Sequence, residues 1–190
     1  MKQFCKWTLA AALLSLTLTP GSPLRAADTS TEDQLIAQLS SPDERVVTRA
    51  LLRLEKQFFT STNAFPAARK LLTDSRPMVQ RKAARYLAVE HAKLDETDIK
   101  TICTLLTSSD PKTVMDGLKA LRDLNASQTV PQVLACLKST DDYVLRDACR
   151  TLAVLANKDV IPAIEPLLQH ANPKVQKDAQ DAIAALKSKS

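Results

Sequence analysis

Hydrophobic and polar positions follow one another in an order that recurs every 31 to 34 residues along most of the chain. Each unit has a short apolar segment, then a polar break with Pro or Asp, then a longer segment whose apolar positions keep the 3.6-residue helical period. The last unit shows this order in VIPAIEPLLQ, HANP and KVQKDAQDAIAAL. The pattern predicts two helices per unit, a short apolar one followed by a longer amphipathic one.

The second helices superpose on one small residue, which we call the anchor of each repeat. The five anchors are Ala50, Ala83, Gly117, Ala148 and Ala179. We expect the second helices around residues 43–54, 76–87, 110–121, 141–152 and 172–183. A small anchor allows the two helices of a repeat to approach closely, and because one hairpin cannot bury its apolar face alone, neighbouring hairpins must stack. The sequence predicts an all-α fold, an α-solenoid of about five helix hairpins.

Composition agrees with a helical protein that has one domain. The 190 residues include only two glycines, and aromatic residues make up 4% of the chain. Strand-rich folds need more glycine turns and more β-branched or aromatic runs than this. We therefore expect no sheet.

The first 27 residues have a different pattern, which is typical of a secretory signal peptide. Lys2 and Lys6 precede an apolar run, Trp7–Leu18, which is followed by a Pro-Gly break and small residues. The run of about twelve residues is shorter than the roughly 20 that span a bilayer. We expect residues 1–27 to be a cleaved signal peptide, residues 28–190 to be the repeat domain, and the protein to be periplasmic or secreted. Retention of the segment as an anchor stays open.

The net charge of +5 becomes small once that segment is set aside. Lys2, Lys6 and Arg25 supply three of the basic residues, and from residue 27 onward 23 basic and 21 acidic residues remain. A nearly neutral domain gives no electrostatic basis for binding nucleic acid. We expect no nucleic-acid partner.

The sequence contains no motif for catalysis or for metal binding. Cys103, Cys136 and Cys149 fall on apolar stripes of predicted helices, where free thiols behave as small hydrophobic groups. Whether any of them is disulfide-bonded or reactive stays open. His91 and His170 are isolated, and no phosphate loop, HExxH or GxSxG sequence occurs. We expect no enzyme activity, no metal, no cofactor and no small-molecule substrate.

Two stretches, VIPAIEPLLQHANPKVQKDAQDAI and TVPQVLACLKSTDDYVLRDACRTL, resemble HEAT repeats. They are similar to the short HEAT-like repeats of the phycobilisome-lyase type, in which a Pro-led apolar helix and an Asp-Pro turn precede a Val-Arg-x-x-Ala-Ala helix. The similarity covers about residues 31–187. It implies a solenoid whose second helices line a concave surface, and a function in protein binding. It also raises a lyase-like accessory role, against which the export signal argues.

Basic residues on the second helices are the candidate binding site. The candidates are Arg45, Arg49, Arg53, Arg81, Lys82, Arg85, Lys119, Arg146 and Arg150. In repeats three and four we expect Asp116 to pair with Lys119 and Asp147 with Arg150, since residues three apart are neighbours on a helix. The segment from Arg45 to Arg85 contains ten basic residues and only two acidic ones.

This local excess predicts a basic patch on repeats one and two. The patch is interpreted either as a docking site for an acidic segment of a partner or as a solvated charged face. The function we expect is an exported, non-catalytic protein-binding scaffold that uses the concave face of the solenoid. The alternative is a binder of anionic envelope surfaces, such as lipid headgroups, lipopolysaccharide or a cell-wall polymer. The identity of the partner and the oligomeric state stay open.

Overall fold

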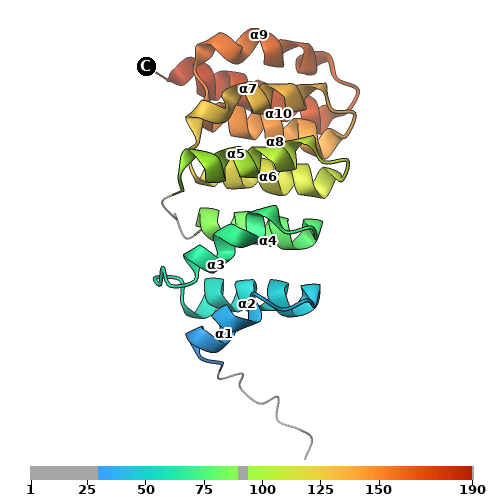
Figure 1. The fold of residues 1–190 in the computed structure, drawn as a ribbon. Coiled ribbons are helices and arrows are strands. Elements are labelled where there is room, and N and C mark those ends of the chain that lie inside the picture. Colours follow the sequence, from blue (N-terminus) through green and yellow to red (C-terminus); the bar gives the residue numbers. More distant parts are fainter. Residues whose placement is uncertain (1–29, 90–93, 190) are drawn as a thin grey trace, which may run out of the picture.

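The computed structural model of this chain describes residues 30–89 and 94–189. Within these ranges every regular element is a helix, and five helix hairpins stack in chain order from the N-terminal to the C-terminal end (Figure 1). The predicted all-α solenoid of five hairpins is confirmed. The predicted signal peptide, residues 1–27, and His91 lie outside the described residues.

Each hairpin pairs a short first helix with a longer second helix. The second helices are α2 (Glu44–Gln57), α4 (Pro77–Val89), α6 (Pro111–Asp123), α8 (Asp142–Leu155) and α10 (Pro173–Ser188). The first helices are α1 (Glu32–Gln38), α3 (Phe65–Lys70), α5 (Glu96–Thr104), α7 (Val130–Ala135) and α9 (Ile161–Ile164). The last four continue into the 3-10 turns η1 (Leu71–Thr73), η2 (Leu105–Thr107), η4 (Cys136–Lys138) and η6 (Glu165–Gln169), and η3 (Ser127–Thr129) and η5 (Lys158–Val160) precede α7 and α9.

The polar breaks set the starts of the second helices. The side chains of Asp43, Asp110, Asp141 and Asn172 are N-caps that accept hydrogen bonds from backbone N–H groups of the first turn. These groups have no partner inside the helix, so a capping side chain stabilises the turn. Proline stands in the first turn of α6 and α10, where a missing N–H breaks no hydrogen bond.

The anchors lie where the second helices are packed inside the array. All five are buried. A Cβ atom placed on Gly117 would lie 3.0 Å from Cβ of Leu105 and 3.1 Å from Cδ2 of Leu106, both on η2 of the same repeat. The third repeat therefore packs so tightly that its anchor has no room for a methyl group without movement of its neighbours.

The second helices form the more closely packed layer of the stack. Each packs against the next, from α2 to α10, whereas successive first helices make sparser contacts with one another. The core runs without interruption through all five repeats, from Leu35 to Leu186.

The second helix of the third repeat ends in a left-handed turn. Asn125 has a φ of 51°. The N–H of Ala126 donates to the carbonyl of Leu121, and the N–H of Asn125 donates to the carbonyl of Arg122. This is the Schellman arrangement that closes helices, with asparagine at the position that glycine usually occupies.

No helix within the described ranges is long and apolar enough to cross a bilayer.

Candidate protein-binding face

The exposed sides of the second helices form one face, which we call the inner face. In each second helix this face has four positions: five, two and one residues before the anchor, and two residues after it. These positions lie along one stripe because the helix repeats every 3.6 residues. Eight of the nine basic residues selected from the sequence occupy these positions. The ninth, Arg53, stands one position further along α2, and its Nη1 lies 3.4 Å from Oγ of Ser30.

Two boundaries between repeats are crossed by an arginine–aspartate ion pair, which we call an inter-repeat bridge. Nε of Arg81 on α4 donates to Oδ2 of Asp116 on α6 at 2.7 Å. Nε of Arg146 on α8 donates to Oδ2 of Asp178 on α10 at 2.6 Å. In both bridges the arginine stands two residues before its anchor and the aspartate one residue before the next anchor. In each bridge the charge of the guanidinium is offset by a carboxylate of the next repeat.

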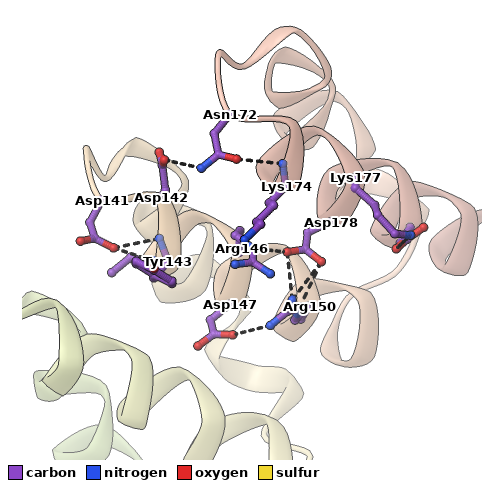
Figure 2. A network of polar contacts seen from close by, with 12 residues as sticks. Asp141, Asp142, Tyr143, Arg146, Asp147, Arg150, Asn172, Lys174, Lys177 and Asp178 are labelled. Atoms are coloured by element: carbon purple, nitrogen blue, oxygen red, sulfur yellow. Dashed lines mark hydrogen bonds and ion pairs between the residues drawn. The ribbon is translucent and has the colours of Figure 1, made fainter.

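The bridge between α8 and α10 belongs to a larger polar network. Figure 2 shows Arg146 and Arg150 converging on Asp178. Arg150 also lies 3.3 Å from Asp147 on its own helix. Both arginines are therefore engaged within the protein.

The N-cap of α6 adds a second carboxylate beside Arg81. Oδ2 of Asp110 lies 3.4 Å from Nη1 of Arg81 and accepts a hydrogen bond from the hydroxyl of Thr113 at 2.7 Å. The hydroxyl bond first, then backbone N–H bonds and the charge of Arg81, lower the pKa of Asp110. Arg81 therefore lies between the carboxylates of Asp116 and Asp110.

These contacts correct part of the charge pattern expected from the sequence. The pair Asp147–Arg150 is confirmed. The expected pair Asp116–Lys119 is wrong, because the guanidinium of Arg81 on the neighbouring helix engages Asp116 instead. Arg85 is also neutralised, since its Nη2 lies 3.3 Å from Oε1 of Glu55. The unpaired positive charge of repeats one and two is smaller than the sequence suggested.

The bridge is missing between α2 and α4, where Thr48 and Lys82 hold the two bridge positions. A hollow of about 370 Å³ opens there, with Leu51 and Leu52 in its lining. Four cations line it. Arg45, Arg49 and Lys82 form no ion pair with a residue that the structure describes, whereas Arg85 pairs with Glu55, which is also in the lining. We call this hollow the basic groove.

The bridge is also missing between α6 and α8, because Met115 stands where an arginine would be. A second hollow, of about 400 Å³, lies at this boundary and is lined by Pro111, Met115 and Tyr143 together with the charged residues Asp110, Lys112 and Asp141. The ring of Tyr143 is 62% exposed and lies 6.0 Å from the guanidinium carbon of Arg146. We call it the apolar hollow. Neither Met115 nor Tyr143 was a candidate from the sequence. Met115 is nevertheless the one apolar residue among the five that stand two residues before an anchor.

The three cysteines within the described ranges are free thiols. Cys136 and Cys149 are buried, and burial raises their pKa values to about 11 and about 12. Cys103 is half-buried, and burial raises its pKa as well. The prediction that these side chains serve as core hydrophobic groups agrees with their positions.

Comparison with known proteins places the chain in a family. The model of the HEAT repeats matches residues 65–148 and 130–190, which is more than half of the chain. No curated protein matches the sequence. Among solved structures, the chain is similar to the complex of CpcE and CpcF of phycocyanin lyase from Nostoc sp. PCC7120, with a TM-score of 0.73, 20% identity, and 90% of this chain and 70% of that chain covered.

Two designed or engineered proteins share the fold. One is an engineered protein with a TM-score of 0.61, 26% identity, and 83% of this chain and 79% of that chain covered. The other is a designed armadillo repeat protein in complex with the peptide (KR)4, with a TM-score of 0.63, 20% identity and 80% of each chain covered. The repeat register, the buried anchors and the family match agree, and the chain belongs to the HEAT-repeat family.

Proposed function

We propose that this protein is a non-catalytic scaffold that binds another protein through its inner face. The basic groove carries the proposal. On a face where Arg81, Arg85, Arg146 and Arg150 are all engaged by carboxylates, the groove keeps three cations without an ionic partner above an apolar lining. Groups of this kind favour an acidic segment with some apolar character.

Solved structures of the same fold support protein binding as its use. CpcE and CpcF of phycocyanin lyase form a complex with each other, and a designed armadillo repeat protein holds the basic peptide (KR)4. The inner face of the present chain has the opposite preference, because its unpaired groups in the basic groove are cations. A curved groove with three cations also suits a chain segment better than a flat anionic surface, which needs a broad positive area.

The proposal includes export. The order of charged, apolar and small residues in positions 1–27 supports a secretory signal, so that the scaffold would act in the periplasm or outside the cell. Cell fractionation with an antibody to the repeat domain, together with N-terminal sequencing of the recovered protein, tests this part. Recovery of the intact chain from the cytosol alone would contradict it.

The binding part is tested by crosslinking and capture from cell-envelope extract with the full chain. The variant Arg45→Glu, Arg49→Glu, Lys82→Glu reverses the groove, and the control Lys70→Glu, Lys138→Glu, Lys158→Glu makes the same change of charge on exposed side chains outside the inner face. We expect the parent and the control to capture a defined protein that the groove variant loses. Equal capture by all three would contradict the proposal, and capture of lipid or glycan without a defined protein would favour an anionic surface.

A further inference from the structure

The four boundaries along the inner face alternate in chemistry. From α2 to α10 they are the basic groove, the Arg81–Asp116 bridge, the apolar hollow and the Arg146–Asp178 bridge. Both hollows occur where the bridge residues are replaced, by Thr48 and Lys82 in one case and by Met115 in the other. These two hollows, of about 370 and 400 Å³, are larger than the hollow of about 180 Å³ that lies beside the Arg146–Asp178 bridge.

The basic groove offers charge to a ligand. Arg45 and Arg49 are exposed, one turn apart on α2, and Lys82 faces them from α4 across the hollow. Side chains that approach from two helices can hold one or two carboxylates between them. The leucines of the lining exclude water from one side and strengthen that attraction.

The apolar hollow offers a different contact. Pro111, Met115 and the exposed ring of Tyr143 line it. Exposed aromatic and methionine side chains at a concave site are typical anchors for an apolar side chain of a partner. Met115 also packs partly against the core, whereas the ring of Tyr143 is 62% exposed.

The spacing of the two hollows sets the spacing of the groups that could fill them. Packed helix axes lie about 8–10 Å apart, so two repeats separate the hollows by about 16–20 Å. An extended chain advances about 3.3 Å per residue and covers this span in about five or six residues. Between the hollows it would cross the Arg81–Asp116 bridge, where the guanidinium is paired with the carboxylates of both Asp116 and Asp110.

We propose that the partner segment is an extended peptide that binds at both hollows at once. It carries one or two acidic residues for the basic groove and, about five or six residues away, a large apolar residue for the apolar hollow. This inference rests on the proposed function, because it names the segment that the scaffold recognises. The two contacts together give a selectivity that three surface cations alone do not have.

Synthetic peptides test the inference through their affinity for the full chain, measured by fluorescence anisotropy. The probes hold Glu-Glu and Phe, separated by Ser/Gly spacers of about two, five and eleven residues, which suit a short, an extended and a helical ligand. We expect the intermediate spacer to bind best, at least about tenfold more tightly than versions with Glu-Glu→Ser-Ser or Phe→Ser. No dependence on spacer length, or an optimum at the longest spacer, would overturn the inference.

Two variants assign each group of the peptide to its hollow. Lys82→Glu should remove the contribution of Glu-Glu, whereas Met115→Arg should remove only the contribution of Phe. The second variant places an arginine within reach of the column that holds Asp147, as in the intact bridges, so we expect it to fold, and its melting curve checks this. An unchanged gain from Phe in Met115→Arg would overturn the inference. If the groove variant loses the partner captured from extract while no peptide shows a spacer optimum, the scaffold function stands and the two-point ligand is wrong. Binding of phosphatidylglycerol vesicles but of no peptide would contradict both the scaffold function and the two-point ligand.

Discussion

The guanidinium of Arg81 on α4 and the carboxylate of Asp116 on α6 lie 2.7 Å apart across the boundary between the second and third repeats. The same relationship joins Arg146 to Asp178 two repeats later. At the other two boundaries the residues at these positions cannot form it, and a hollow lies there instead. At this pair of positions an arginine and an aspartate join two of the four boundaries, whereas the boundary between α2 and α4 is crossed at other positions by Arg85 and Glu55.

Replacement of Arg81 by methionine is expected to destabilise the protein by about 1–3 kcal/mol, because Asp116 loses a charged hydrogen-bond partner at a site where Arg81 is only 13% exposed. Urea unfolding followed by circular dichroism measures the change. The matched control is Lys177→Met, in the same column of the last repeat, where the lysine is 73% exposed and pairs only with Asp181 on its own helix. The control should lose less than about 0.5 kcal/mol. Equal losses would show that the bridge adds nothing beyond an exposed ion pair.

Replacement of Gly117 by valine should lower the free energy of unfolding by about 1–3 kcal/mol, since the first added carbon already meets Leu105 at 3.0 Å. Thermal unfolding of the variant is compared with that of Lys119→Val, which adds the same residue to an exposed position of α6. A variant at position 117 as stable as this control would mean that the third hairpin has room to spare.

The end of α6 gives a sharper comparison, because Asn125 has a left-handed backbone. Asn125→Ala should cost about 1 kcal/mol, whereas Asn125→Gly should leave stability within about 0.5 kcal/mol, because only the alanine side chain opposes a positive φ. Both values come from urea titrations of the full chain. Loss of equal stability in both variants would point to a role for the asparagine side chain instead of the backbone.

Thiol labelling tests the burial of the cysteines. With a pKa of about 12, Cys149 has almost no thiolate at pH 8, and its sulfur is shielded, so we expect it to resist iodoacetamide in the folded protein. Cys103, which is half-buried, should react sooner, and all three should react in urea. Mass spectrometry of peptides from timed samples gives the order. Fast labelling of Cys149 without denaturant would show that the fourth repeat opens.

The sequence predicted the repeats well because their signals are local. Pro and Asp at the breaks and a small residue at each anchor occur within a few residues of the helices that they define, and the anchors proved buried. The position of the basic residues on one face followed from the helical period alone. These features depend on spacing within a repeat, which a single sequence shows directly.

The charge balance could not be predicted in the same way, because the partners come from different repeats. The spacing of three residues on one helix predicts a pair of Asp116 with Lys119, whereas the partner of Asp116 is Arg81, 35 residues away. A comparison between neighbouring repeats reveals both bridges in the sequence. Arg81 and Arg146 stand two residues before their anchors, and Asp116 and Asp178 stand one residue before the next anchors. Tyr143, which is 62% exposed, was missed because the positions five residues before the anchors were not compared between repeats.

Photo-crosslinking in cells that make the full chain tests whether the inner face holds a partner protein. A photoreactive amino acid is placed at Leu52 in the basic groove, at Tyr143 in the apolar hollow, and at Ala163 on α9 in the layer of first helices, all of which are exposed. If the inner face holds a partner, we expect the positions of Leu52 and Tyr143 each to give an adduct, both of the same mass, and the position of Ala163 to give none. An adduct from Ala163 with none from the two inner positions would contradict it.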